Sequence, residues 1–306
     1  MSRTTLRVAL TGSTGFVGRH VLAALLDRGC HVRALARTPD KLKAHGSAVT
    51  PIQGDLFDPA ALRELCEGAD AVVHLVGIIA EKPAQGQTFD RVHHQGTMNL
   101  LAAADRGVKR WVHMSALGAR PANGDTLSDY HRTKWLAEEA VRASALQWTI
   151  FRPSIIHGPE GEFMQLVKGF WTGLFPPFVP YFGKEATAGR LQPVWVGDVA
   201  RCFAAAVDSP RAVGEVYPMG GPDAYTWPQL YKTVKQRLPA AKNKPIVGVP
   251  VWYAKLIAGM PGVPFNRDQV IMSQEDSLCD IGKVQRDFDL TLARFEDKLA
   301  EYAPRM

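Results

Sequence analysis

Two groups of residues in this 306-residue chain have types and spacings that could do chemistry. The first is the run Thr-Gly-Ser-Thr-Gly-Phe-Val-Gly over residues 11–18, in which glycine recurs at every third position. The second is Tyr130 and Lys134, one helical turn apart. A glycine-rich turn can hold a phosphate, and a tyrosine beside a lysine can exchange a proton. Together they predict a nucleotide site next to an acid–base site.

The glycine run lies between an apolar segment typical of a strand, Leu6–Leu10, and an amphipathic segment typical of a helix, Phe16–Asp27. Gly12 would allow the tight turn, Gly15 a close approach of pyrophosphate, and Gly18 close packing of the helix on the strand. The helix N-terminus adds free N–H groups and the positive end of its dipole. The expected phosphate contacts are Gly12, Ser13, Thr14, Gly15, Phe16 and Val17.

Tyr130 and Lys134 would share one face of a helix, which we expect over about Ser128–Ala143. A nearby ammonium favours the phenolate, so the spacing predicts that Lys134 lowers the pKa of Tyr130 toward neutral pH. Tyr130 and Lys134 are therefore candidate catalytic residues.

Short apolar runs alternate with amphipathic stretches through the first half of the chain, which predicts a Rossmann-type, doubly wound parallel sheet with helices on both faces. Expected strands are 6–10, 31–36, 49–53, 71–76, 111–114 and 148–151, and expected helices are 16–27, 40–44, 59–66, 88–105 and 128–143.

The alternation stops beyond Arg152, apart from Pro193–Ala206, which can return to the core. Residues 1–155, with about 190–207, are therefore expected to form the dinucleotide-binding core. Residues about 156–189 and 208–306 are expected to form a smaller, mixed lobe for a substrate or a partner.

The residues that end the second expected strand bear on the choice of cofactor. NAD-specific proteins place a carboxylate there for the ribose hydroxyls, but no carboxylate occurs before Asp40. Arg33 and Arg37 stand in this segment instead, and a guanidinium matches a 2′-phosphate. A solvated strand-end arginine is the simpler interpretation of Arg33. Arg37 therefore favours NADP(H), with NAD(H) as the alternative.

The spacing GxxGxxG, in place of GxGxxG, resembles the short-chain dehydrogenase/reductase superfamily, whose extended and atypical members begin with TGxxGxxG. The resemblance covers about residues 5–230 well and 268–302 more thinly. It is similar in detail to the atypical group that includes the Rossmann-fold accessory subunit of mitochondrial complex I and bacterial NAD(P)-binding and epimerase-like relatives. Four further blocks carry it: 111–119, 130–139, 151–160 and 193–200.

The resemblance implies a role for Lys134 at the nicotinamide ribose. It also implies that other cofactor contacts come from Asp55, Leu56, Leu75, Val76, Gly77, Pro153 and Ile156. Two positions depart from the family pattern: His93 stands where extended members carry asparagine, and Ala116 where they carry the catalytic serine or threonine. The resemblance makes Ser115, one place earlier, the third candidate catalytic residue, because its hydroxyl can bond to a substrate carbonyl.

Two functions remain open. One is an NAD(P)(H)-binding protein whose cofactor is structural or sensory and whose partner is a respiratory or quinone-related membrane assembly. The other is an active NADP-dependent oxidoreductase, or a nucleotide-sugar epimerase or dehydratase, that uses Tyr130 as its acid–base.

Composition excludes several other classes. The chain is 46% hydrophobic with a net charge of +6, and its basic residues form no stripe or tail, so nucleic-acid binding is not expected. The four cysteines and the histidines show no paired ligand spacing, so no metal site is expected and the thiols should be reduced. The first expected strand begins almost at once, and no apolar run is long enough to span a bilayer. We therefore expect a cytoplasmic protein without a targeting segment.

Two aromatic-rich segments lie in the expected lobe. Phe163–Phe182 holds seven aromatic residues in twenty, and Val249–Phe265 contains Trp252, Tyr253, Leu256 and Ile257. They either build the core of the lobe or face an apolar or quinone-like substrate, a protein partner or a lipid surface. In the last case Lys168 and Lys184 would lie near anionic headgroups, with the protein peripheral at the inner face of a membrane.

Overall fold

The computed structural model describes residues 5–104, 107–121, 128–174, 176–186, 188–260 and 263–306. Some residues named in the sequence analysis lie outside the described residues: Met1–Thr4, Asp105 at the end of an expected helix, and the aromatic Phe175.

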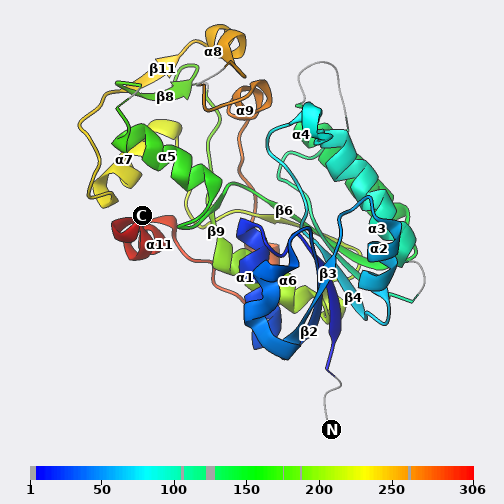
Figure 1. Cartoon of the computed structure of the whole chain (residues 1–306). Coiled ribbons are helices and arrows are strands. Elements are labelled where there is room, and N and C mark those ends of the chain that lie inside the picture. The colour runs from blue at the N-terminus through cyan, green and yellow to red at the C-terminus, as the bar shows by residue number, and fades with distance from the viewer. Residues whose placement is uncertain (1–4, 105–106, 122–127, 175, 187, 261–262) are drawn as a thin grey trace.

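A seven-stranded parallel sheet organises the molecule (Figure 1). Its order is β3-β2-β1-β4-β5-β6-β10, which confirms the predicted Rossmann-type architecture. The order reverses between β1 and β4, and at such a point ligands bind beyond the carboxyl ends of the strands. The strands are β1 Arg7–Thr11, β2 His31–Ala36, β3 Val49–Gln53, β4 Ala71–His74, β5 Arg110–Met114, β6 Gln147–Pro153 and β10 Glu215–Met219.

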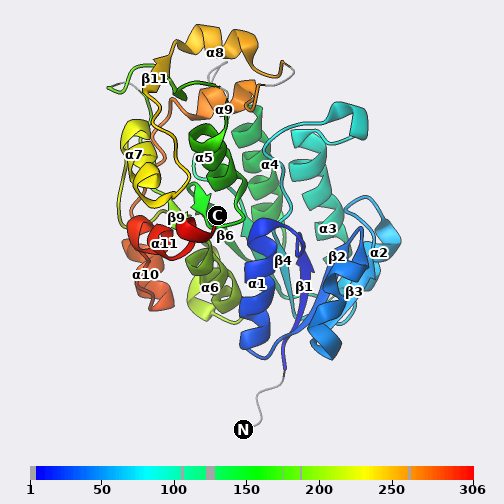
Figure 2. The same ribbon diagram turned by 60° about the vertical axis from the view of Figure 1, so that its left-hand side comes forward.

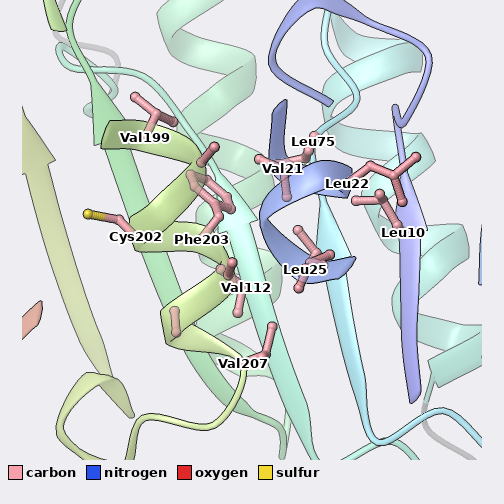
Figure 3. Packing of buried hydrophobic residues seen from close by; sticks show 14 of the residues in the cluster. Leu10, Val21, Leu22, Leu25, Leu75, Val112, Val199, Cys202, Phe203 and Val207 are labelled. Carbon is pink, nitrogen blue, oxygen red and sulfur yellow. The ribbon is translucent and has the colours of Figure 1, made fainter. Parts of the chain in front are cut away.

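Helices cover both faces of this sheet (Figures 1 and 2). Helices α1 (Phe16–Asp27) and α6 (Val196–Ala206) pack side by side on one face, where Leu22, Leu25 and Phe203 are fully buried (Figure 3). Helix α6 forms most of the segment Pro193–Ala206. The opposite face carries α2 (Pro59–Cys66), α3 (Gly96–Ala104) and α4 (Asp129–Ala143).

Capping residues determine where the helices near the site begin. Asp58 accepts hydrogen bonds from the amides of Ala60 and Ala61, which begins α2. Ser128 accepts one from the amide of His131 and begins α4. This cap places Tyr130 in the first turn of α4, at the carboxyl edge of the sheet.

The structure differs from the sequence-based expectations in three places. The helix expected over 88–105 begins as a π-helical turn, Asp90–Gln95, before α3 continues it. The short helix expected at 40–44 lies within a 3₁₀ run, Pro39–Ala48. Strand β10 comes from the range assigned to the lobe, yet it pairs with β6 in the main sheet.

The lobe has a core of its own, built mainly from three helices, α5 (Glu162–Thr172), α7 (Trp227–Arg237) and α11 (Phe295–Tyr302). Its other elements are β7 Ile156–His157, β8 Val179–Phe182, β9 Val194–Trp195, β11 Ile246–Val249, α8 Val251–Ile257 and α9 Arg267–Met272, while α10 (Gly282–Phe288) packs against α6 and β10.

The two aromatic segments have different surroundings. Phe170 and Trp171 from the first segment are buried in the lobe core. Trp252 and Leu256 from the second are 70% and 69% exposed on α8. Core packing therefore accounts for much of the first segment and leaves the second unexplained.

Candidate cofactor and active site

The glycine loop joins β1 to α1 in a conformation that requires glycine at two positions. Gly12 has a φ of +78°, and a Cβ atom there would lie 3.2 Å from the amide nitrogen of Val76. A Cβ atom on Gly18 would lie 1.9 Å from the carbonyl oxygen of Gly12. Gly18 therefore permits α1 to pack directly on the loop, and Gly12 permits the loop to pass close to the end of β4.

The first turn of α1 suits a phosphate. Its N-cap, Gly15, provides no side-chain cap, and no acidic residue stands in the turn, so the amides of Phe16 and Val17 have the helix dipole behind them and no carboxylate in front. The Ser13 hydroxyl is fully buried without a hydrogen-bond partner among the described residues. A bound anion would satisfy both kinds of donor, so these residues fit a dinucleotide pyrophosphate.

The two arginines of β2 and the turn after it have different environments. The Arg33 guanidinium donates a hydrogen bond to the backbone carbonyl of Glu64. Arg37 is exposed beyond the end of β2. Arg33 is thus committed to packing α2 on the sheet, and Arg37 is accessible at the carboxyl edge.

Two of the expected cofactor contacts, Asp55 and Leu56, lie in the turn after β3. Asp55 is exposed, and one of its carboxylate oxygens accepts a hydrogen bond from the Phe57 amide at 2.7 Å. Leu56 is buried, and its carbonyl accepts a hydrogen bond from Asn99 at 2.9 Å. The turn after β3 is therefore held from both sides, with the Asp55 carboxylate accessible at the surface.

Tyr130 and Lys134 lie one turn apart on α4. The Tyr130 ring stands edge-on to His93 at a centroid distance of 5.3 Å. The buried Lys134 Nζ donates to the carbonyl oxygen of Met114 at 3.1 Å. Burial raises the pKa of Tyr130 to about 12 and lowers the pKa of Lys134 to about 8. The expectation that Lys134 lowers the Tyr130 pKa is therefore wrong for this structure, because desolvation of the phenol raises that pKa.

Gly77 brings the end of β4 against the same group. A Cβ atom there would lie 2.9 Å from Lys134 Nζ and 3.6 Å from His93 Nε2. Its neighbour Leu75 is buried, and Val76 is half-buried. The structure thus brings together Gly77, His93, Tyr130 and Lys134 at the carboxyl end of β4.

His93, which stands where the family pattern has asparagine, lies in the π-helical turn Asp90–Gln95. Its Nδ1 is 2.9 Å from Thr133 Oγ1, and its Nε2 is 3.1 Å from both the amide nitrogen and the carbonyl oxygen of Ile78. Burial, with a contribution from Lys134, holds the pKa of His93 well below its usual range. His93 is therefore a neutral imidazole with a partner on each nitrogen.

Ser115 directly follows β5 and is buried. Its side chain is 3% exposed, and its hydroxyl has no partner among the described residues. Its amide donates to the carbonyl of Phe151, and Leu117 donates likewise to Pro153 at the end of β6. Ile156 lies in β7 and packs against the core shared by α1 and α6.

Two features of the site were not expected from the sequence. His74 at the end of β4 links Thr11 Oγ1, at 2.7 Å, to Thr97 Oγ1, at 3.1 Å, and so connects the base of the glycine loop with α3. Asp268 of α9 accepts a hydrogen bond from the Asp129 amide at 2.9 Å, which attaches the lobe to the first turn of α4. Their partners are distant in sequence, so only the fold reveals them.

No helix within the described ranges is long and apolar enough to cross a membrane. In the same ranges no group of three or more His, Cys, Asp or Glu side chains is placed to hold a metal ion.

Comparisons with known proteins give the site a family. A family model described as NAD(P)H-binding matches residues 12–169. The ceramide reductase of Caulobacter vibrioides is 32% identical over 228 residues, which cover 74% of this chain and 68% of that protein. The mitochondrial NADH dehydrogenase [ubiquinone] 1 alpha subcomplex subunit 9 of Arabidopsis thaliana is 30% identical over 232 residues, or 72% of this chain and 54% of that longer protein.

Solved structures show the same fold. The crystal structure of gox2253 superposes with a TM-score of 0.76 over 98% of this chain and 97% of that chain, at 23% identity. The UDP-glucose 4-epimerase of Thermus thermophilus, in complex with NAD, superposes with a TM-score of 0.73 over 97% and 98%, at 21% identity. The matched family model and the relatives in sequence show that this chain belongs to the NAD(P)H-binding family of atypical short-chain dehydrogenases/reductases.

Proposed function

We propose that this chain binds NADP(H) across the carboxyl edge of its sheet. The pyrophosphate would lie on the glycine loop, the adenosine 2′-phosphate against Arg37, and the nicotinamide ribose against Lys134. The observation that carries this proposal is the unsatisfied donor set of the loop, formed by the uncapped first turn of α1 and by the buried Ser13 hydroxyl, which has no partner among the described residues.

The preference for the phosphorylated cofactor rests on the arginines at β2. Arg33 is held by the Glu64 carbonyl, while Arg37 stands exposed at the edge where the adenosine ribose would lie. A guanidinium forms charge-assisted, bidentate bonds with phosphate. The first carboxylate after β2 is Asp40, three residues beyond Arg37.

Two observations favour a cofactor that is held rather than turned over. Ala116 provides no hydroxyl at the position where the family pattern has serine or threonine. Both nitrogens of His93 are committed to neighbouring groups. Such a protein resembles the complex I subunit among its relatives, and we place it in the cytoplasm, peripheral at the inner face of a membrane, with a membrane-associated protein partner.

A second function, reduction of a carbonyl on an apolar or quinone-like substrate, is favoured by Tyr130. Its raised pKa keeps the phenol protonated at neutral pH, so it is poised to donate a proton to a carbonyl oxygen. When bound, NADPH supplies the hydride, and hydride plus proton convert the carbonyl to an alcohol. The name of the ceramide reductase relative supports an apolar substrate. Nucleotide-sugar epimerisation or dehydration, suggested by the epimerase-like fold neighbours, would need a more polar lobe.

The test begins with freshly purified protein. The nucleotide released on denaturation is identified by mass spectrometry, and the affinities for NADPH and NADH are compared by the fluorescence of the bound reduced cofactor. Retained NADP(H), or at least tenfold tighter binding of NADPH, supports the proposal. NAD(H) alone, or no binding of either nucleotide, contradicts it.

Tyr130→Phe separates the two functions. Under the binding function, this variant retains cofactor affinity and no carbonyl substrate oxidises the wild-type cofactor. Under the reductase function, an apolar ketone or quinone consumes NADPH in the wild type, and the variant loses that activity by a factor of roughly 100 or more.

A further inference from the structure

Helix α8 and the strand before it expose a set of large apolar side chains at one end of the lobe. Figures 1 and 2 show α8 at the end of the molecule opposite the N-terminus. We call this set the α8 face; its members are Val247 (38% exposed), Trp252 (70%), Tyr253 (45%), Leu256 (69%) and Met260 (54%). We propose that the α8 face docks the protein on the surface of an anionic lipid bilayer.

The helix itself is too short to be held by its own hydrogen bonds. Its seven residues, Val251–Ile257, are attached to the lobe through Ala254, which is fully buried. Its two most exposed side chains, Trp252 and Leu256, turn their apolar surface toward water instead. An exposed tryptophan and leucine on a short amphipathic helix are typical of a segment that lies in a membrane interface.

The charge around the α8 face identifies the occupant. Residues 224–267 contain seven basic residues and no acidic residue, whereas the whole chain has a net charge of only +6. The seven are Lys232, Lys235, Arg237, Lys242, Lys244, Lys255 and Arg267. This stretch therefore carries more positive charge than the whole protein does net. Lys255 lies on α8 itself and Arg267 on α9, which packs against α8, so basic residues stand beside the exposed apolar helix as anionic headgroups require.

A hollow of about 370 Å³ between α5, α7 and β11 concentrates part of this charge. Lys232, Lys235 and Lys244 line it together with Glu185, the one carboxylate among its described lining residues. The Lys235 ammonium lies 5.2 Å from the centre of the Trp171 ring, whose buried Nε1 has no partner within the described ranges. Lys244 Nζ donates to the carbonyls of Phe170 and Pro176, and Lys235 Nζ donates to Asn243, so these lysines contribute positive charge to the lobe rather than free ligands.

Strand β11 joins the hollow to the α8 face. Ile246 lines the hollow, and the next residue, Val247, belongs to the exposed apolar set. Successive side chains on a strand point to opposite sides. The hollow and Val247 therefore lie on opposite sides of one short strand that leads into α8, so the lysines of the hollow act on an anionic surface only through their long-range charge.

Helix α9 connects the α8 face to the candidate active site. Helix α8 packs on α9, whose N-cap Asn266 donates to the carbonyl of Ile79 at 2.9 Å. Asp268 in α9 accepts a hydrogen bond from the amide of Asp129, the residue before Tyr130. Docking would hold the bilayer one short helix away from Tyr130. Docking on a bilayer does not require the proposed function. The inference rests on that function only where it implies that the substrate or the partner resides in the membrane.

The test is flotation of the intact protein with two kinds of vesicle, one of phosphatidylcholine alone and one containing phosphatidylglycerol. We expect flotation with the anionic vesicles and little with the neutral ones. Trp252→Glu combined with Leu256→Glu should weaken binding by about tenfold or more, because both apolar contacts are lost and two negative charges are added. Lys232→Glu with Lys255→Glu should weaken it while leaving the apolar side chains in place.

Matched controls lie on the other part of the molecule. Met98 is 49% exposed on α3, and Lys109 is exposed just before β5, so Met98→Glu and Lys109→Glu should float like the wild type. Thermal melting and cofactor affinity of every variant establish that the fold and the proposed cofactor site are intact. Loss of vesicle binding with retained NADPH binding supports docking by the α8 face.

Three results would overturn the inference. Equal flotation with neutral vesicles would remove the role of charge. Unchanged flotation of the Trp252/Leu256 variant would place the contact elsewhere. No flotation of the wild type, with self-association that this variant abolishes, would assign the face to a second copy of the chain. A protein that floats but binds no dinucleotide would contradict the proposed function alone.

Discussion

His93 Nδ1 lies 2.9 Å from Thr133 Oγ1, which joins the π-helical turn before α3 to the helix that carries Tyr130 and Lys134. The Thr133 hydroxyl donates its proton to the carbonyl of Asp129, so toward His93 the hydroxyl oxygen acts as an acceptor. The proton of the neutral His93 ring is therefore on Nδ1. Nε2 then accepts from the Ile78 amide. The histidine thus fixes three segments around the site while remaining uncharged.

Acid should destabilise the protein through its buried neutral histidines. Burial lowers the pKa of His74 and His157 to about 3 and of His131 to about 4, with His93 and His113 also lowered. The folded-state pKa values lie below the unfolded value, so this stability is fully present above about pH 6.5 and is lost as the pH falls. Each of these histidines should remove roughly 1.4 kcal/mol per pH unit below pH 6.

Thermal melting between pH 8 and pH 4.5 measures this effect. His113 has no hydrogen-bond partner on either ring nitrogen among the described residues, so His113→Leu should reduce the acid sensitivity without removing a visible bond. A melting temperature that stays level down to pH 5 would show that these rings are charged or hydrated in the folded protein.

Arg37→Asp should change the choice of cofactor. It replaces the proposed 2′-phosphate ligand with a carboxylate suited to ribose hydroxyls, so NADPH affinity should fall by roughly 10- to 100-fold while NADH affinity holds or rises. Fluorescence titration with both cofactors measures the ratio. Arg211→Ala, another exposed arginine, is the control and should leave both affinities unchanged. Equal losses for both cofactors would contradict a 2′-phosphate role.

Gly18→Ala should disable the glycine loop. The new methyl group would stand 1.9 Å from the Gly12 carbonyl oxygen and 2.8 Å from the Ser13 Cα, so the backbone must move. We expect loss of dinucleotide binding and a destabilisation of about 1–3 kcal/mol, measured by titration and urea unfolding. Gly169→Ala in α5 meets no atom within 4 Å and should instead stabilise by about 0.5–1 kcal/mol.

Glu138→Gln should loosen α4 on the sheet. The fully buried Glu138 carboxylate accepts two hydrogen bonds from Arg152 of β6, at 2.7 and 2.6 Å, and one from Arg142, at 2.8 Å. Removing one partner of a buried pair leaves uncompensated charge, and about 3 kcal/mol of stability should be lost. Its neighbour Glu139 has a 52% exposed side chain, so Glu139→Gln should cost no more than about 0.5 kcal/mol. If urea unfolding showed the same loss of stability for both variants, the burial of Glu138 would not strengthen its ion pairs.

The sequence predicted the first half of the fold well because each buried strand is a short apolar run and the helices between them are amphipathic. Phe16–Asp27, His31–Ala36 and Pro59–Cys66 have the expected bounds. The seventh strand, Glu215–Met219, was not expected, because a tyrosine and a proline interrupt its short apolar pattern. Its place in the sheet depends on pairing with β6, which no local pattern encodes.

The site was predictable in its parts but not in its electrostatics. Spacing placed Tyr130 and Lys134 on one face of α4, and the family resemblance identified His93 as the unusual residue. Spacing could not show that Lys134 bonds to the Met114 carbonyl, or that the phenol is desolvated. Both depend on how deeply the α4 face is covered, which is a property of the assembled fold.

The return of α6 to the face of the sheet beside α1 has a consequence for synthesis on the ribosome. The α1 segment emerges with the apolar side chains of Val21, Leu22 and Leu25 uncovered, and their partner Phe203 is made some 180 residues later. At ordinary translation speeds that interval is roughly 10 to 35 s. A nascent chain that ends just after residue 169 contains the whole region that matches the family model. It still lacks α6, which covers the sheet beside α1, and the edge strand β10. This face of the sheet and its last strand can therefore form only after residues 196–219 have been made.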